Sequence, residues 1–144
     1  MSDAPETRPL REPIGILLAI FALGNLANAA WMLAAPAHWY LNLPANVPGS
    51  GPLNEHFVRD IGCVFGLIGV GLAIGAVRPA ARFGAMLFAS GFYAAHAGVH
   101  VYDSLRGLFA PGQWTYDLFP VYGATLILIA LTVHVGRSRP AGRA

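Results

Sequence analysis

Four long apolar runs constrain the fold of this chain more than any other feature. We place them at residues 14–35, 56–77, 83–102 and 116–135. Each is about as long as the roughly 20 residues that a helix needs to cross the hydrocarbon of a bilayer. Charged residues make up 11% of the 144 positions, against about a quarter in ordinary soluble domains. The sequence therefore predicts an all-α integral membrane protein, folded as an antiparallel four-helix bundle.

The arginines set the expected orientation, since the chain contains no lysine. Seven of the nine lie before the first run, between the second and third, or after the fourth, and only Arg59 and Arg106 lie at the other ends. By the positive-inside rule, both termini are cytoplasmic. The expected location is the cell inner membrane, with several spans. Residues 1–13 and 136–144 are expected to be mobile cytoplasmic ends.

The first run also resembles a secretory signal, because small residues follow it at Leu33–Ala37. Its apolar stretch is longer than the roughly 7–15 residues usual for a signal peptide. We expect an uncleaved helix, although the sequence leaves cleavage open.

The second and third runs carry ionisable side chains at helical spacing. His56, Asp60 and Cys63 are spaced i, i+4 and i+7 and share one helix face, and the third run repeats this spacing at His96, His100 and Asp103. If the short "RPAAR" connection closes an antiparallel hairpin, Asp60 lies level with His100, because both helices rise about 1.5 Å per residue. We therefore expect a polar layer near the outer surface. Asp117 and Tyr122 can extend it from the fourth run, with unknown rotation.

This layer predicts a transition-metal site for copper, iron or zinc, because neutral imidazole is the commonest ligand of such ions. The expected ligands are His56, Asp60, His96, His100 and Asp103. The expected supporting residues are Cys63, Asn28, Tyr93, Arg59 and Glu55. A haem ranks below a bare ion, since equal depth on adjacent helices leaves little room for a porphyrin. Metal-centred redox chemistry on a small or lipid-soluble substrate is the expected reaction class, and whether the protein is an enzyme stays open.

Two alternatives explain the same layer without a metal. The polar groups can form a structural network in an accessory or scaffold subunit, whose small-residue faces dock to a larger membrane complex or to a second copy. They can also line a proton or small-solute pathway. The formal charge of +2 comes from termini and turns, so the lipid bilayer is the expected partner and nucleic acid is not.

The segments "NEHFVRDIG" and "YAAHAGVHVYD" resemble a family of small, uncharacterised bacterial four-span membrane proteins. In that family N-x-H-x-V-R-D-x-G opens the second span and H-x-x-x-H closes the third. The matching residues are Asn54, His56, Arg59, Asp60, Gly62, His96 and His100. The chain departs from the family at Ala95, where proline is common. The resemblance implies that the layer acts as a unit, without implying an activity; similarity to DoxX-like membrane proteins extends only to architecture.

Overall fold

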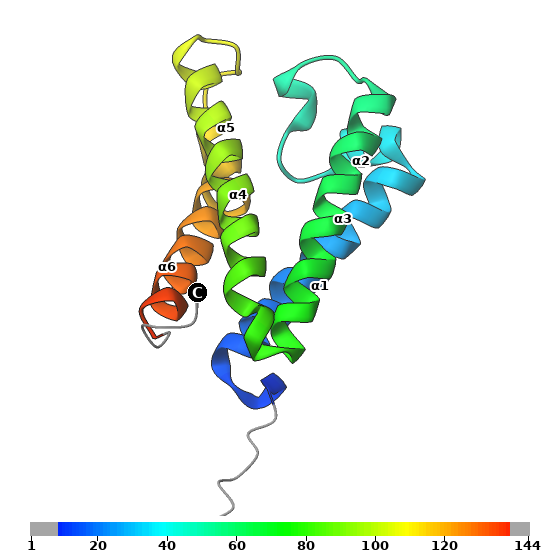
Figure 1. Cartoon of the computed structure of the whole chain (residues 1–144). Coiled ribbons are helices and arrows are strands. Elements are labelled where there is room, and N and C mark those ends of the chain that lie inside the picture. Colours follow the sequence, from blue (N-terminus) through cyan, green and yellow to red (C-terminus); the bar gives the residue numbers. More distant parts are fainter. Residues whose placement is uncertain (1–8, 139–144) are drawn as a thin grey trace, which may run out of the picture.

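The structure is a computed structural model that describes residues 9–138. This range is helical and contains no strand (Figure 1). The long helices are α1 (Pro13–Ala34), α3 (Glu55–Val77), α4 (Arg82–Leu105) and a fourth stretch in which α5 (Gln113–Asp117) continues through the π-helical segment Leu118–Gly123 into α6 (Ala124–Arg137). The shorter elements are α2 (Pro36–Asn42) and the 3₁₀ turns Pro9–Arg11, Val47–Ser50 and Pro79–Ala81. The predicted all-α class is confirmed, and the long helices begin and end within three residues of the expected runs.

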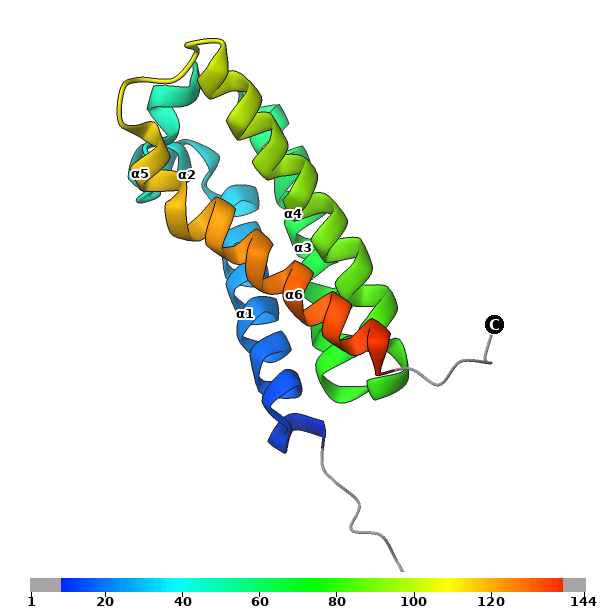
Figure 2. The same cartoon turned by 90° about the vertical axis from the view of Figure 1, so that its left-hand side faces the viewer.

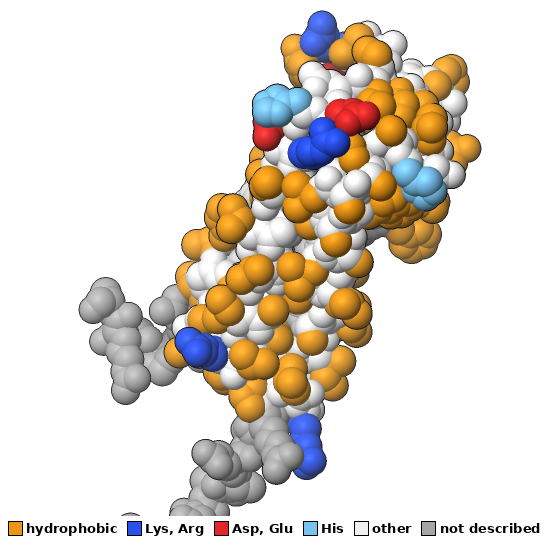
Figure 3. Space-filling model, turned by 90° about the vertical axis from the view of Figure 1, so that its right-hand side faces the viewer, with side chains coloured by type: hydrophobic (Ala, Val, Ile, Leu, Met, Phe, Trp, Pro, Cys, Tyr) orange, Lys and Arg blue, Asp and Glu red, His pale blue; other side chains and the backbone are white. Residues whose placement is uncertain are grey.

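Within residues 9–138, three helical segments are long and apolar enough to cross a membrane, and they indicate a membrane protein. They are Pro13–Ala34, Glu55–Val77 and Gln113–Arg137. Helix α4 is also long, at 24 residues, but it is not among these segments because it carries more polar side chains. On the face drawn in Figure 3, ionisable side chains gather toward the two ends and hydrophobic side chains cover the length between them.

Local sequence explains where the helices begin and end. Pro13 occupies the first turn of α1, where its missing N–H costs nothing. The Asn54 side chain accepts a hydrogen bond from the Phe57 amide at 3.1 Å and so caps α3. Gly107, just beyond the end of α4, has φ +69°, a left-handed conformation that glycine adopts without strain.

The helices form two pairs that diverge from one end. Helix α1 packs along α3, α4 packs against α6, and the pairs meet at the Pro79–Ala81 turn (Figures 1 and 2). Glycines of α3 explain this arrangement. A Cβ at Gly62 or Gly69 would lie within 3.0 Å of α1 side chains, whereas one at Gly75, near the turn, would meet α4. Thus α3 packs closely on α1 along most of its length. Away from the turn it reaches α4 through the large side chain of Phe65, whose ring centroid lies 5.4 Å from that of Phe92. This arrangement differs from the close α3–α4 hairpin that we expected.

The end at which the two helix pairs meet, which we call the closed end, is stabilised by an apolar core and a buried arginine. The fully buried side chains of this core include Leu18, Leu72, Met86 and Leu128. Arg82 donates from Nε to the Gly75 carbonyl at 3.1 Å and forms an ion pair with Glu12. Its Nη2 also donates to the Pro9 carbonyl at 3.3 Å, so the turn Pro9–Arg11 is held within the segment 1–13 that we expected to be mobile. The rest of that segment, residues 1–8, and most of the expected tail, residues 139–144, lie outside the described range.

Candidate functional site

A cleft separates the two helix pairs above the closed end. It consists of two adjoining cavities of about 540 and 580 Å³, within the range of roughly 300–1,000 Å³ typical of small-molecule sites. One cavity lies between α3 and α4, and the other between α1 and the stretch from Asp117 to Ala124. The cavities share several lining residues, among them Met32, Trp39, Ile61, His96 and His100. The two cavities therefore form one cleft with the histidines between them.

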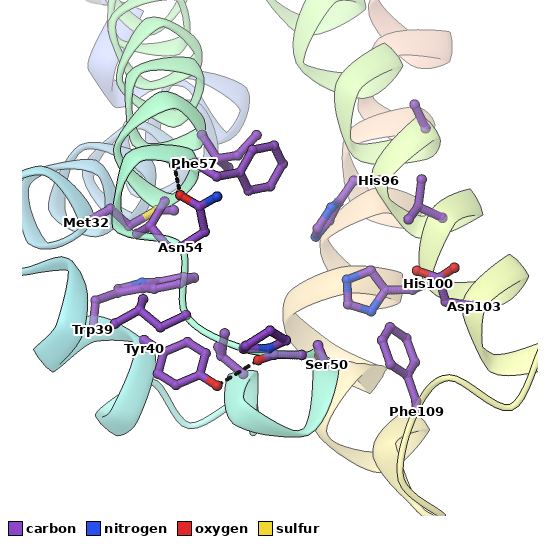
Figure 4. Close-up of a pocket in the computed structure, with 18 of the residues that line it drawn as sticks. Met32, Trp39, Tyr40, Ser50, Asn54, Phe57, His96, His100, Asp103 and Phe109 are labelled. Carbon is purple, nitrogen blue, oxygen red and sulfur yellow. Dashed lines mark hydrogen bonds between the residues drawn. The ribbon is translucent and has the colours of Figure 1, made fainter.

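His96 and His100 project from one face of α4 into this cleft. Figure 4 shows both rings pointing away from α4 toward the side that carries Trp39 and Tyr40. The two ring centroids are 4.6 Å apart at an angle of 69°. His96 stacks on Phe92, with centroids 5.9 Å apart and planes 6° apart, and His100 packs against Phe109 at 5.4 Å. Aromatic contacts on α4 and on the following loop thus fix both imidazoles.

Asp117 is the buried acid of the site. Its Oδ2 lies 2.8 Å from Nδ1 of His100, and its side chain is 1% exposed. Its Oδ1 accepts a hydrogen bond from Nε2 of Gln113 at 3.2 Å. Gln113 also donates to the Ala45 carbonyl at 2.9 Å and accepts from Nδ2 of Asn46 at 2.8 Å. The loop after α2 is therefore joined through Gln113 to the His100–Asp117 pair.

The π-helical segment Leu118–Gly123 follows Asp117 directly. A π-helical turn holds more residues than an α-helical turn, so it changes the rotation of the preceding residues about the axis of α6. Pro120 lies in this segment and has no backbone donor, which favours an interrupted hydrogen-bond pattern. Sequence reasoning left the rotation of Asp117 unknown, and an irregular turn of this kind is the reason that helical periodicity could not supply it.

The opposite wall is apolar with internally satisfied polar groups. Trp39 donates from Nε1 to Oδ1 of Asn28 at 2.8 Å, and Asn28 Nδ2 lies 3.4 Å from the Met32 sulfur. Deeper in the cleft, the Tyr93 hydroxyl donates to Oδ1 of Asn25 at 3.1 Å and links α4 to α1. The expected supporting residues Asn28 and Tyr93 therefore both line the cleft, although they bond to protein groups.

The structure does not bring the expected metal-binding layer together. His56 and Asp60 pair with each other at 3.4 Å, their side chains are 88% and 60% exposed, and neither lines the cleft. Cys63, which we expected to support the layer, lies on the same helix face and is also exposed. The prediction that this face meets α4 is wrong, because the glycines of α3 turn a different face toward α1. Phe57, rather than His56, lines the cleft.

The remaining predicted residues divide between the cleft and the surface. Arg59 and Glu55 form an exposed ion pair at 3.0 Å, outside the cleft. Asp103 lines the cleft beside His100, but His100 pairs with Asp117 instead. Among residues 9–138, no group of three or more histidine, cysteine or acidic side chains is arranged to hold a metal ion.

Comparisons of this chain with protein-family models, curated proteins and solved structures gave no match. The functional proposals below therefore depend on the geometry and chemistry of the cleft.

Proposed function

We propose that this chain is a four-span inner-membrane protein that binds a small lipid-soluble molecule in the cleft between its helix pairs. The observation that carries the proposal is the combination of apolar walls with polar groups that converge at one place, His96, His100 and the buried Asp117. Small-molecule sites commonly have this composition, in which apolar walls bury the ligand and a few polar groups orient it.

The side chains of α4 support its role as the fourth span. His96 and His100 face the cleft, and the Ser90 hydroxyl lies 2.7 Å from the Thr132 hydroxyl of α6. Large apolar side chains such as Leu87 and Phe88 are exposed on the rest of the helix. Because these three polar side chains face α6 or the cleft, α4 can contact lipid despite its lower hydropathy. The arginines near the closed end support a cytoplasmic location for that end by the positive-inside rule. In this orientation the cleft is directed toward the outer face.

Unpartnered polar atoms in the cleft favour an occupant with a polar end. No hydrogen bond joins either ring nitrogen of His96, or Nε2 of His100, to another described residue. No fully buried side-chain nitrogen or oxygen in the described range lacks a partner, so these nitrogens are accessible. A polar group at membrane depth is costly unless it meets a partner or water. A bound molecule with a polar end and an apolar body satisfies both the nitrogens and the walls.

The proposal is tested by filling the cleft. Gly24 lines it, and a Cβ at this position has no neighbour within 4 Å. Gly24→Phe therefore adds side-chain volume at the cleft without a clash at its Cβ. Gly91→Phe is the matched control, because Gly91 also lies in a helix with open space around it but outside the cleft.

Mass spectrometry of molecules that co-purify with the protein in lipid nanodiscs gives the readout. We expect wild type and Gly91→Phe to retain the same small molecule, at about one per chain, and Gly24→Phe to lose it. Equal retention by Gly24→Phe, or no enrichment over empty nanodiscs in wild type, would contradict the proposal.

The expected transition-metal site remains a prediction with fewer ligands, since His56 and Asp60 lie outside the cleft. Elemental analysis of the same preparations tests it directly: stoichiometric copper, iron or zinc that is lost in His96→Ala would restore it. The scaffold alternative predicts neither metal nor bound molecule, and the pathway alternative predicts pH-dependent transport in proteoliposomes.

A further inference from the structure

We propose that the molecule bound in the cleft carries a hydroxyl group that donates a hydrogen bond to Nε2 of His100. The cleft would then select lipid-soluble alcohols and phenols over the corresponding ethers. This inference rests on the proposed function, the binding of a lipid-soluble molecule between the helix pairs, and it specifies the polar end of that molecule.

The argument begins with the fixed orientation of the Gln113 amide. Its oxygen accepts from Nδ2 of Asn46, and its nitrogen lies 2.9 Å from the Ala45 carbonyl, which can only accept. Reversing the amide would place the Gln113 oxygen against the Ala45 carbonyl oxygen, and neither can donate. Nε2 of Gln113 therefore donates to Oδ1 of Asp117, and the carboxylate is an acceptor at this oxygen.

The second carboxylate oxygen determines which nitrogen of His100 carries the proton. We take Asp117 to be ionised, so that both of its oxygens accept. The 2.8 Å contact between Asp117 Oδ2 and His100 Nδ1 then places a proton on Nδ1. A neutral imidazole has one donor and one acceptor nitrogen, and the partner of one nitrogen sets the role of the other. Nε2 of His100 then presents a lone pair, and no described residue donates to it.

Three aromatic donors of the cleft lining are engaged by protein acceptors. The Trp39 indole donates to Asn28, the Tyr40 hydroxyl donates to the Gly51 carbonyl at 2.7 Å, and the Tyr93 hydroxyl donates to Asn25. These strong donors of the lining are thus engaged by protein acceptors. A neutral His96 has one unpaired N–H in the cleft, but an alcohol and its ether can both accept from it. Only the hydroxyl can also donate to the free acceptor of His100.

A pair of probes isolates this difference. 4-Hexylphenol and its methyl ether, 4-hexylanisole, share a ring, a chain and an oxygen, and only the phenol donates a hydrogen bond. Equilibrium dialysis of each probe against protein-loaded and empty nanodiscs of the same lipid gives the excess bound to protein. We expect the phenol to bind wild type about tenfold more tightly, the effect of one satisfied hydrogen bond.

Variants test whether His100 and its tautomer cause the preference. In Asp117→Asn the amide can donate to Nδ1 of His100, which moves the proton to Nε2; the corresponding change in Ser-His-Asp enzymes has this effect. The phenol preference should disappear or reverse. His56→Ala is the matched control, because His56 also pairs with an aspartate but lies outside the cleft; it should leave both affinities unchanged. Gel filtration and circular dichroism report folding. His100→Phe keeps a ring against Phe109 but has no acceptor nitrogen, and it serves if Asp117→Asn does not fold.

The outcomes separate this inference from the proposed function. Equal affinities for phenol and ether in wild type, with binding above empty nanodiscs, overturn the inference and leave the cleft as a ligand site. A phenol preference that persists in a folded Asp117→Asn, or in His100→Phe if that variant is used, also overturns it. Binding of neither probe above empty nanodiscs counts against both proposals.

Discussion

The divergence of the helix pairs depends on the close contact between α1 and α3, and Gly69→Ala tests that contact. A Cβ at Gly69 would lie 2.7 Å from Cγ of Leu26 and 3.1 Å from its backbone nitrogen. The side chain of Leu26 can rotate, but the nitrogen belongs to α1 and moves only with that helix. Either α1 shifts away from α3 or Leu26 leaves its preferred rotamer.

The expected magnitude follows from two opposing effects. Overpacking a close contact costs about 1–3 kcal/mol, and alanine in place of glycine favours the helix by about 0.5–1 kcal/mol. We therefore expect Gly69→Ala to lower the free energy of unfolding by about 1–2 kcal/mol. Gly98→Ala is the control, because nothing lies within 4 Å of a Cβ there; it should stabilise by about 0.5–1 kcal/mol.

The assay is unfolding in mixed micelles of rising dodecyl sulfate fraction, followed by circular dichroism. The difference between the two variants is the quantity of interest, since each replaces a helical glycine by alanine. If Gly69→Ala proves as stable as Gly98→Ala, the glycine contact does not set the packing of α3 on α1, and the rotation of α3 needs another explanation.

Three further predictions concern polar side chains. Arg82→Gln should destabilise the fold by about 3 kcal/mol in the same unfolding assay, because it removes a buried guanidinium that donates to several backbone carbonyls. Arg78→Gln, on the exposed side of the turn, is the control and should leave the stability nearly unchanged. A double-mutant cycle of Ser90→Ala and Thr132→Val should give a coupling of about 0.6 kcal/mol, as is usual for hydrogen bonds between membrane helices; a coupling near zero would contradict their 2.7 Å contact. His56→Ala should change the free energy of unfolding by less than about 0.5 kcal/mol. A larger loss would contradict the exposed position of the His56–Asp60 pair.

Much of the helical architecture could be predicted from the sequence because its causes are local. The lengths of the apolar runs gave helix positions to within three residues. The cap at Asn54 is likewise formed within one turn of the chain. His96 and His100 were also identified by their spacing, and the structure places both in the cleft.

The partners of these histidines could not be predicted from spacing. His100 meets Asp117 from a segment 17 residues later, through a π-helical turn that breaks the regular periodicity. Gln113 showed no pattern in the sequence, because its role depends on a loop 68 residues earlier, at Ala45. A polar residue beside a proline-containing break in an apolar helix is the signal that points most directly to such a site.

The sequence by itself determined that the chain is helical and suited to a membrane, since run length and composition act within each segment. Only the tertiary structure decided which face of each helix meets its neighbour. Backbone contact at Gly62 and Gly69 rotates α3 so that His56 and Asp60 face outward, while α4 turns His96 and His100 into the cleft. Rotation about a helix axis is set by packing against a partner, and spacing along one helix does not contain that information.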